Sequence, residues 1–413
     1  MSVFLKSIGS YTLVNIINKG IPFLLLPVLT HYLTKEDFGL LTNIESLIVI
    51  TVALIGINFS SAVTRQFVKK DVDLKRYVST VFRVVLVSFS IVTWLFTTFA
   101  HVIFEWTAIP KLVLYAISVF ALLDNLMEVV LALWRMEDKP FKYGAFRITR
   151  TLIEVIITLV LVIGVKYNWQ GRFYGLYIAG ALSGMFAFLY LFLNKYLTKG
   201  FDKNYKKHFL KFGLPLVPHT ISGVLIMYSD KLIITKYLGI GENGVYSVAF
   251  TIGMAISLLQ NSFNQAWVPW LFKKLALNSN TEKKKLVKIT YIYMVGMLLL
   301  ALILWLVTPV IYMFLGKDFS EGMGVVAIIG LGFAFNGMYK MMVNYMFYAE
   351  KTQIISLITI FIAILNITLS VLFIKKYGIL GTAYASSISF FVQFIVTWFI
   401  SNKIYPMPWF KFK

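Results

Sequence analysis

The sequence predicts an all-α polytopic membrane protein, with twelve transmembrane helices in two parallel-repeat six-helix lobes around a central cleft. Three observations predict the membrane class, and the first two are compositional. Of the 413 residues, 59% are hydrophobic and only 14% are charged, whereas soluble domains carry roughly 45–50% and about 25%. The third observation is that apolar stretches recur at the length of about 20 residues that a bilayer-spanning helix needs. This composition excludes soluble enzymes, disordered tails and secreted disulfide scaffolds.

Twelve apolar stretches reach this length. In chain order they are residues 9–33, 38–63, 78–103, 108–134, 146–165, 173–194, 212–238, 244–271, 289–315, 323–349, 354–374 and 379–401. The first is not expected to be a cleavable signal peptide, because Asn15, Asn18 and Lys19 interrupt it and no small-residue cleavage site follows.

The loops alternate in charge, which predicts the orientation. One set comprises residues 65–76, 135–150, 195–211 and 273–288; with Lys6, Lys351 and the C-terminal lysines it holds 27 Lys and Arg residues. The alternate set holds eight: Lys35, Lys111, Lys166, Arg172, Lys236, Lys317, Lys375 and Lys376. Because cytoplasmic loops are enriched in Lys and Arg, both termini are expected in the cytoplasm. Most of the net charge of +21 therefore reports topology, and no nucleic-acid partner is expected.

Several kinds of chemistry are excluded by residue type. The chain has no cysteine and only four scattered histidines, so disulfides, thiolate metal sites and His/Cys metal sites are not expected. No cofactor is expected. The outer loops are short, so recognition must take place inside the helical bundle or at its mouths.

Two weak internal repeats divide the chain into halves. Residues 30–39 match residues 235–244 at four of ten positions, at an offset of 205, and residues 171–179 resemble 378–385. Because each half has six spans, the second half begins on the same side of the membrane as the first. The repeats must therefore be parallel, related by an axis along the membrane normal. The expected divisions are an N-terminal lobe (1–194), a basic cytoplasmic linker (195–211), a C-terminal lobe (212–401) and a cytoplasmic tail (402–413).

Two lysines lie well inside predicted spans, one in each half. Lys19 belongs to the first span, and Lys340 belongs to the tenth, where Asn336, Lys340 and Asn344 share one helix face at i, i+4 and i+8. Ionisable residues in a span are costly and usually face a cavity or a partner. The two lysines predict a cationic cleft suited to phosphate or acidic sugars; the asparagines serve equally well as structural hydrogen-bond formers.

Carboxylates inside the spans have two interpretations of equal weight. Asp124 and Glu128 share a face of the fourth span with Arg135, and Glu154 lies in the fifth. Asp124 and Glu128 exchange protons during a transport cycle, or they pair with Arg135. Other arginines near the basic loops are expected to extend along the apolar surface toward water: Arg83, Arg147 and Arg150.

The segment from Asp230-Lys231 to Gly239, followed by Gly244-Val-Tyr246-Ser-Val-Ala249, resembles a known family. The family is that of the bacterial oligosaccharide-lipid flippases, which serve O-antigen and capsule synthesis within the multidrug/oligosaccharidyl-lipid/polysaccharide exporter superfamily. Supporting segments are Gln265-Ala-Trp-Val-Pro269, the Phe38-Gly39 turn and Gly378-Ile-Leu-Gly381-Thr-Ala-Tyr-Ala385. The likeness covers essentially the whole chain in length, span count and repeat.

The resemblance implies a flippase of the bacterial inner membrane that alternates between inward- and outward-open states. Its cargo would be a polyprenyl-pyrophosphate-linked oligosaccharide, with membrane lipids, a polysaccharide polymerase and other assembly proteins as partners. Head-group binding would fall to the lysines above together with Asn336, Asn344, Lys231 and Arg135. Coupling to a proton or sodium gradient would fall to Asp124, Glu128, Glu154 and Asp230, although structural support by the Asp230-Lys231 pair is as plausible.

Three alternatives remain. A multidrug/cation antiporter of the same superfamily would favour a cleft dominated by carboxylates. A major-facilitator-type sugar transporter would carry a glycine-bearing motif between spans 2 and 3, and residues 64–73 contain no glycine. A membrane-embedded polysaccharide polymerase or ligase, which is an enzyme, would need a large external loop.

Overall fold

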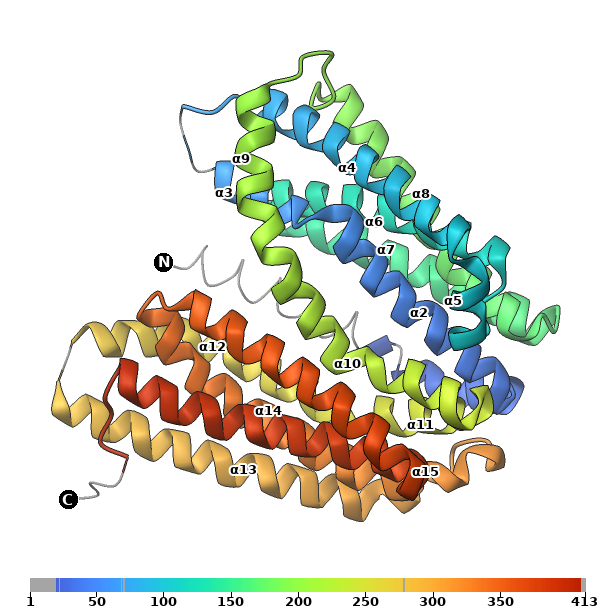
Figure 1. Ribbon diagram of the computed structural model, residues 1–413, viewed down its shortest axis with the longest axis vertical. Coiled ribbons are helices and arrows are strands. Elements are labelled where there is room, and N and C mark those ends of the chain that lie inside the picture. Colours follow the sequence, from blue (N-terminus) through green and yellow to red (C-terminus); the bar gives the residue numbers. More distant parts are fainter. Residues whose placement is uncertain (1–19, 22, 68, 70, 278, 410–413) are drawn as a thin grey trace.

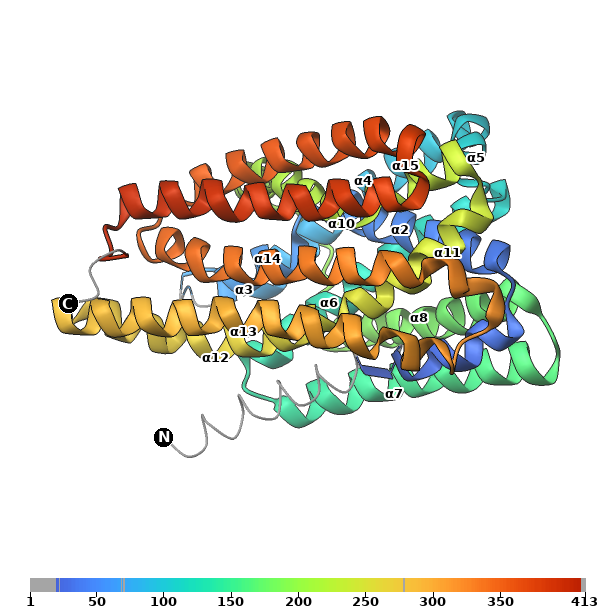
Figure 2. The same ribbon diagram turned by 90° about the horizontal axis from the view of Figure 1, so that it is seen from below.

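A computed structural model describes residues 20–21, 23–67, 69, 71–277 and 279–409. The fold is built from helices arranged in two groups, which converge at one end and diverge toward the other (Figure 1). The first group runs from α2 to α8 and the second from α10 to α15. Viewed from below, helices α12 to α15 lie roughly parallel to one another (Figure 2).

The helices of the first group follow the predicted spans. They are α2 (Lys35–Gly56), α3 (Phe59–Phe67), α4 (Leu74–Thr98), α5 (Ala100–Thr107), α6 (Lys111–Met136), α7 (Pro140–Leu159), the π-helical η1 (Val160–Gly164) and α8 (Asn168–Leu193).

Helix α9 (Lys203–Gly213) and η2 (Leu214–Leu216) lead from the first group to the second. The elements of the second group are α10 (Val217–Leu238), α11 (Ile240–Gly253), α12 (Ala255–Ala276), α13 (Asn280–Tyr312), η3 (Lys317–Gly322), α14 (Met323–Tyr348) and α15 (Thr352–Ile404).

The architecture agrees with twelve spans in two lobes. Within the described residues, nine helices are long and apolar enough to cross a membrane, counting α9 to α10, α11 to α12 and η3 to α14 as one each. Gly378 has φ 58° and divides α15 into two legs, 352–377 and 379–404, which form two spans. The α7–η1 helix and the shorter apolar helix Phe23–Tyr32, which lies within the first predicted span, account for the other two.

One predicted span is divided into two helices where the backbone leaves the right-handed helical conformation. Residues Ile57 and Asn58 take left-handed φ values and separate α2 from α3 inside one predicted span. At the other end of α2, Thr34 and Asp37 form a capping box, each satisfying a backbone N–H of the other. These local signals set where α2 begins and ends.

Each lobe has its own hydrophobic core. One cluster of buried side chains comes from residues 25–209, and the other from residues 226–409 together with Leu26. The expected linker 195–211 contains most of α9, whose Phe209 is fully buried in the first core. The expected tail is also partly folded, because the Trp409 side chain is 2% exposed and its carbonyl accepts a hydrogen bond from Tyr291 at 2.9 Å. The proposed boundaries between divisions stay predictions.

The lobes meet at a contact that we call the seam, formed by Lys35, Gly39 and Asn43 on α2 with Ile240, Asn243 and Gly244 on α11. A methyl group at Gly39 would collide with the carbonyl oxygen of Ile240, and one at Gly244 with that of Lys35. The repeat offset of 205 relates Gly39 to Gly244 and Lys35 to Ile240. The two lobes therefore present equivalent surfaces to each other, as in a two-fold interface.

Buried amides reinforce the seam. Asn243 Nδ2 donates to the Gly39 carbonyl at 3.0 Å and to Asn43 Oδ1 at 2.9 Å. Asn43 Nδ2 in turn donates to Thr107 and to Thr235. Both asparagines are fully buried. In membrane helices, small residues permit close backbone approach, and interhelical hydrogen bonds add to the packing.

A second contact between the lobes runs along α2. Helix α10 lies antiparallel to α2, with Thr235 bonded to Asn43 at the seam and Thr220 bonded to Asn58 toward the opposite end. We call this opposite end the basic end, because the loops 65–76, 135–150, 195–211 and 273–288 lie there. Helix α10 thus closes one side of the space between the lobes.

The seam generates a stability prediction. We expect Gly39→Ala and Gly244→Ala each to cost about 1–3 kcal/mol, because an added methyl group must displace backbone atoms. Gly296→Ala on α13 is the matched control, since a methyl group there would meet nothing within 4 Å. The measurement is the apparent melting temperature in detergent. Equal behaviour of all three variants would show that the seam is not tightly packed.

Candidate functional site

A cavity of about 100 Å³ lies between the lobes. It is lined by the first span, α2, α8 and α11, and its polar lining comes from Glu45, Arg172, Thr42, Ser247 and Thr251. Charged and hydroxyl groups thus face the space between lobes at membrane depth. Such groups in a span are retained where they face a cavity or a partner.

An ion-pair chain crosses the N-terminal lobe at this cavity. Arg172 on α8 contacts Glu154 on α7 at 2.6 Å and Glu45 on α2 at 3.6 Å. The Arg172 side chain is 11% exposed, whereas that of Glu45 is 44% exposed. Arg172, counted with the outer loops from the sequence, therefore lies inside α8 and holds two carboxylates. It compensates the charge of Glu154 and leaves Glu45 facing the cavity.

The aspartate of the Asp230-Lys231 pair lies in a cage of hydroxyl groups. Its carboxylate accepts hydrogen bonds from Tyr246 at 2.9 Å, from Ser370 at 3.1 Å and from Ser386. Asn366 donates to Ser386 at 3.2 Å. These partners come from α11 and both legs of α15. Asp230 is fully buried, and within the described part of the chain no ion pair joins it to a basic side chain.

The ammonium of Lys231 packs against aromatic rings. Its ammonium lies 4.5 Å from the ring centroid of Tyr228 and 4.6 Å from that of Phe250. Aromatic faces stabilise a desolvated cation in this arrangement. The side chain is 7% exposed and interacts electrostatically with Glu45 of the other lobe. Asp230 and Lys231 thus make different direct contacts, with hydroxyl groups for the first and aromatic rings for the second.

Two polar contacts join α12 to α14. Lys340 Nζ donates to Asn261 Oδ1 at 2.6 Å, and Asn344 Nδ2 donates to Asn264 Oδ1 at 2.8 Å. Lys340 is partly exposed and Asn344 is buried. Asn336 lies one turn earlier on the same face of α14 and is partly exposed.

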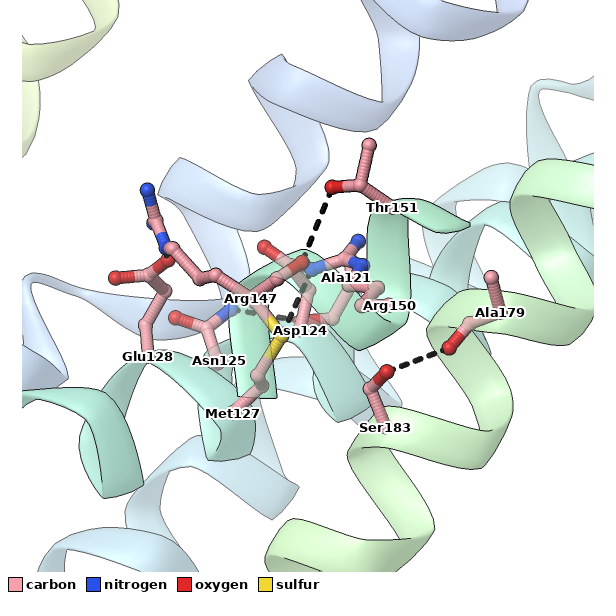
Figure 3. A network of polar contacts seen from close by, with 10 residues as sticks. All are labelled: Ala121, Asp124, Asn125, Met127, Glu128, Arg147, Arg150, Thr151, Ala179 and Ser183. Carbon is pink, nitrogen blue, oxygen red and sulfur yellow. Dashed lines mark hydrogen bonds and ion pairs between the residues drawn. The ribbon is translucent and has the colours of Figure 1, made fainter. Parts of the chain in front are cut away.

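The carboxylates of α6 pair with α7 (Figure 3). Glu128 accepts from Arg147 at 2.7 Å, and Asp124 accepts from Arg150 at 2.8 Å. Arg147 and Arg150 were expected to extend toward water, and that expectation is wrong because a carboxylate lies opposite each. The alternative in which Arg135 is their partner is also not observed.

Arg135 lies at the end of α6, exposed, with its guanidinium 5.5 Å from the ring centroid of Tyr143. Lys19, the other lysine of the predicted cationic cleft, lies outside the described residues. The proposed roles of these residues and of the carboxylates stay predictions. The structure brings together Glu45, Glu154 and Arg172 at the interlobe cavity and places Asp124 and Glu128 in a separate pair of contacts.

Comparison with known proteins places this geometry in a family. The model of a family described as polysaccharide biosynthesis protein matches residues 4–275. The chain belongs to this family. A relative that spans nearly the whole chain is the "Lsg locus putative protein 1" of Haemophilus influenzae, which is 22% identical over 95% of this chain and 98% of its own length. The resemblance stated from the sequence is confirmed.

Solved structures of transporters share the fold of this family member. The lipid II flippase MurJ, in an inward closed conformation, gives a TM-score of 0.72 at 16% identity and covers 97% of this chain and 87% of its own. An inward-facing multidrug resistance MATE family transporter of the MOP superfamily gives a TM-score of 0.69 at 16% identity, over 95% and 94%. The predicted fold class is confirmed: the chain is an all-α, multi-pass membrane protein with this fold.

Glu45 and Arg172 are site residues that the sequence analysis missed. Glu45 is an acidic residue inside a predicted span, and that signal was available. Arg172 immediately precedes the predicted span 173–194, where one residue of boundary error turns a bundle residue into a loop residue. Its two carboxylate partners lie on other helices and could not be read from spacing.

The α6–α7 pairs generate a second prediction. Removing one partner of the Asp124–Arg150 pair, by Asp124→Asn or Arg150→Gln, should cost about 3 kcal/mol, because it leaves a largely buried charge without its partner. The double variant should cost less than the sum of the two. The measurement is unfolding in mixed micelles. The exposed Glu137–Lys139 pair is the control, at about 0–1 kcal/mol; additive costs for Asp124 and Arg150 would contradict the coupling.

Proposed function

We propose that the protein is a flippase. It carries polyprenyl-pyrophosphate-linked oligosaccharide repeat units from the cytoplasmic to the outer leaflet of the bacterial inner membrane, for synthesis of O-antigen, capsule or exopolysaccharide. The observation that carries the proposal is the family match over residues 4–275. The fold shared with a lipid II flippase supports it. Both termini are cytoplasmic in this proposal, and a polysaccharide polymerase and other assembly proteins are its partners.

Lys340 is the residue to which we assign the acidic sugar part of the head group. It is an ammonium in a span, partly exposed, on the α14 face that also carries Asn336 and Asn344. Such an ammonium is costly in the membrane unless it meets water or an anion. Its hydrogen bond to Asn261 of α12 fixes the position of its ammonium group. Lys19, Lys231 and Arg135 are further candidates for the same role.

This assignment predicts a loss of surface polysaccharide. Lys340→Ala should reduce the amount exported at least several-fold, because a charged hydrogen bond to the head group is removed. Surface polysaccharide is measured in cells that carry each variant as their only copy, together with the amount of protein in the membrane. Lys351→Ala, which removes the same charge from an exposed loop, is the control.

Normal export by the Lys340 variant would remove that residue from the head-group site. The flippase function itself is tested by deleting the gene and analysing the lipid fraction by mass spectrometry. The function requires a lipid-linked saccharide to accumulate; export of a drug or cation in its place would identify the antiporter alternative.

Asp230 is the carboxylate to which we assign ion coupling. A buried carboxylate without a salt bridge needs a proton or a bound cation to offset its charge. The hydroxyls of Tyr246, Ser370 and Ser386 surround it with oxygen atoms, and oxygen is the ligand that hard cations prefer. The cage fits either a proton or a sodium ion. Glu154, Asp124 and Glu128 are less suited, because each has an arginine partner.

The coupling assignment predicts a change in ion dependence. In Asp230→Asn, export should no longer respond when the proton gradient is collapsed or when sodium is replaced by potassium, whichever governs the unaltered protein. Asp138→Asn, in an exposed loop, should leave the response intact. Export in Asp230→Asn that keeps the full ion response would make Asp230 a structural residue.

A further inference from the structure

An apolar groove runs along the outer face of the N-terminal lobe, between α4, α2 and the α9–α10 junction. Its volume is about 620 Å³. Helix α4 contributes one face at i and i+4 spacing, with Val87, Ile91 and Leu95, which are 59%, 53% and 38% exposed. Leu214 of η2 forms part of the opposite wall and is 50% exposed. The groove is thus lined by aliphatic side chains that the fold leaves uncovered.

Two cations lie on the lining at its basic end, Arg83 on α4 and Lys206 on α9. Arg83 is fixed in place, because it donates to the Thr198 carbonyl at 2.8 Å. Ser79 donates to the same carbonyl and anchors the loop to α4. A guanidinium carries five N–H donors, and among the described residues Thr198 is the hydrogen-bond partner that Arg83 has. Lys206 has no ion pair or side-chain hydrogen bond within the described part of the chain.

From Arg83 to Leu95 the groove follows α4 for about 18 Å, at 1.5 Å per residue. A ligand that satisfies both the charge and the lining must therefore carry an anionic head at the basic end and an aliphatic chain along α4. Two cations suit a head with more than one negative charge. A simple apolar lipid surface would require neither cation.

We infer that this groove binds the polyprenyl diphosphate part of the cargo, with the diphosphate at Arg83 and Lys206 and the isoprenoid chain along α4. The inference rests on the proposed function. The groove's wall includes Leu54 and Ile57 of α2 and Val217 of α10, the two helices that pack together between the lobes. In this arrangement the lipid lies on the outer face of the N-terminal lobe beside the lobe junction, with its head group at the basic end of α4.

The test uses the full-length protein purified in detergent and three probes: farnesyl diphosphate, farnesol and inorganic diphosphate. We expect farnesyl diphosphate to bind at least about tenfold more tightly than either of the others, because only it meets both ends of the groove. The double variant Arg83→Gln/Lys206→Gln should lose about tenfold in its affinity, the size expected for charged hydrogen bonds. Ile91→Trp, or Val87→Trp if the first does not fold, should remove the advantage of the chain without changing the affinity for inorganic diphosphate.

Lys142→Gln is the matched control, because Lys142 lines a different apolar groove, on α7. Unchanged affinity for farnesyl diphosphate in the double variant, at normal thermal stability, would overturn the inference. Equally tight binding of phosphatidylglycerol that depends on the same two cations would also overturn it, in favour of a general anionic-lipid site. The deletion experiment above tests flipping in cells independently of the groove. If the groove binds farnesyl diphosphate but deletion accumulates no lipid-linked saccharide, the proposed function fails while the binding site stands.

Discussion

The close approach of two backbones at Gly39 and Gly244 is the constraint on which the arrangement of the lobes depends. Because neither glycine has a side chain, α2 and α11 come near enough for Asn43 and Asn243 to bond while fully buried. The hydrophobic effect contributes little to association between helices in lipid, so shape and hydrogen bonds must hold the lobes together. The interlobe cavity beside Glu45 exists because the lobes meet at the seam and separate beyond it.

The two lobes treat buried charge in different ways. In the N-terminal lobe each carboxylate of α6 and α7 faces an arginine: Asp124 and Glu128 across the α6–α7 contact, and Glu154 through Arg172. In the C-terminal lobe Asp230 faces hydroxyl groups. The two lobes thus compensate their buried carboxylates with different groups, arginines in the N-terminal lobe and hydroxyl groups around Asp230 in the C-terminal lobe.

The fold could be predicted further than the site. Span count, lobe number and the repeat follow from apolar length and from the match of residues 30–39 with 235–244, because helix formation and insertion are local properties. Side-chain partners between helices are not local. Nothing in the spacing of Asp124 indicates Arg150, which lies 26 residues away on another helix, and nothing in the sequence indicates that Asp230 contacts hydroxyl groups while its neighbour Lys231 contacts aromatic rings. The helix rotation that turns neighbouring residues toward different surroundings becomes visible only in three dimensions.

The equivalence of the two sides of the seam bears on how such a chain arises. A contact in which Gly39 meets Ile240 and Gly244 meets Lys35 is the contact that two identical six-helix chains would make about a two-fold axis. Both halves enter the membrane in the same orientation, so duplication and fusion of one gene for a homodimer would preserve it. After fusion each half could diverge, and the unequal distribution of arginines and hydroxyl groups between the lobes is what that freedom permits.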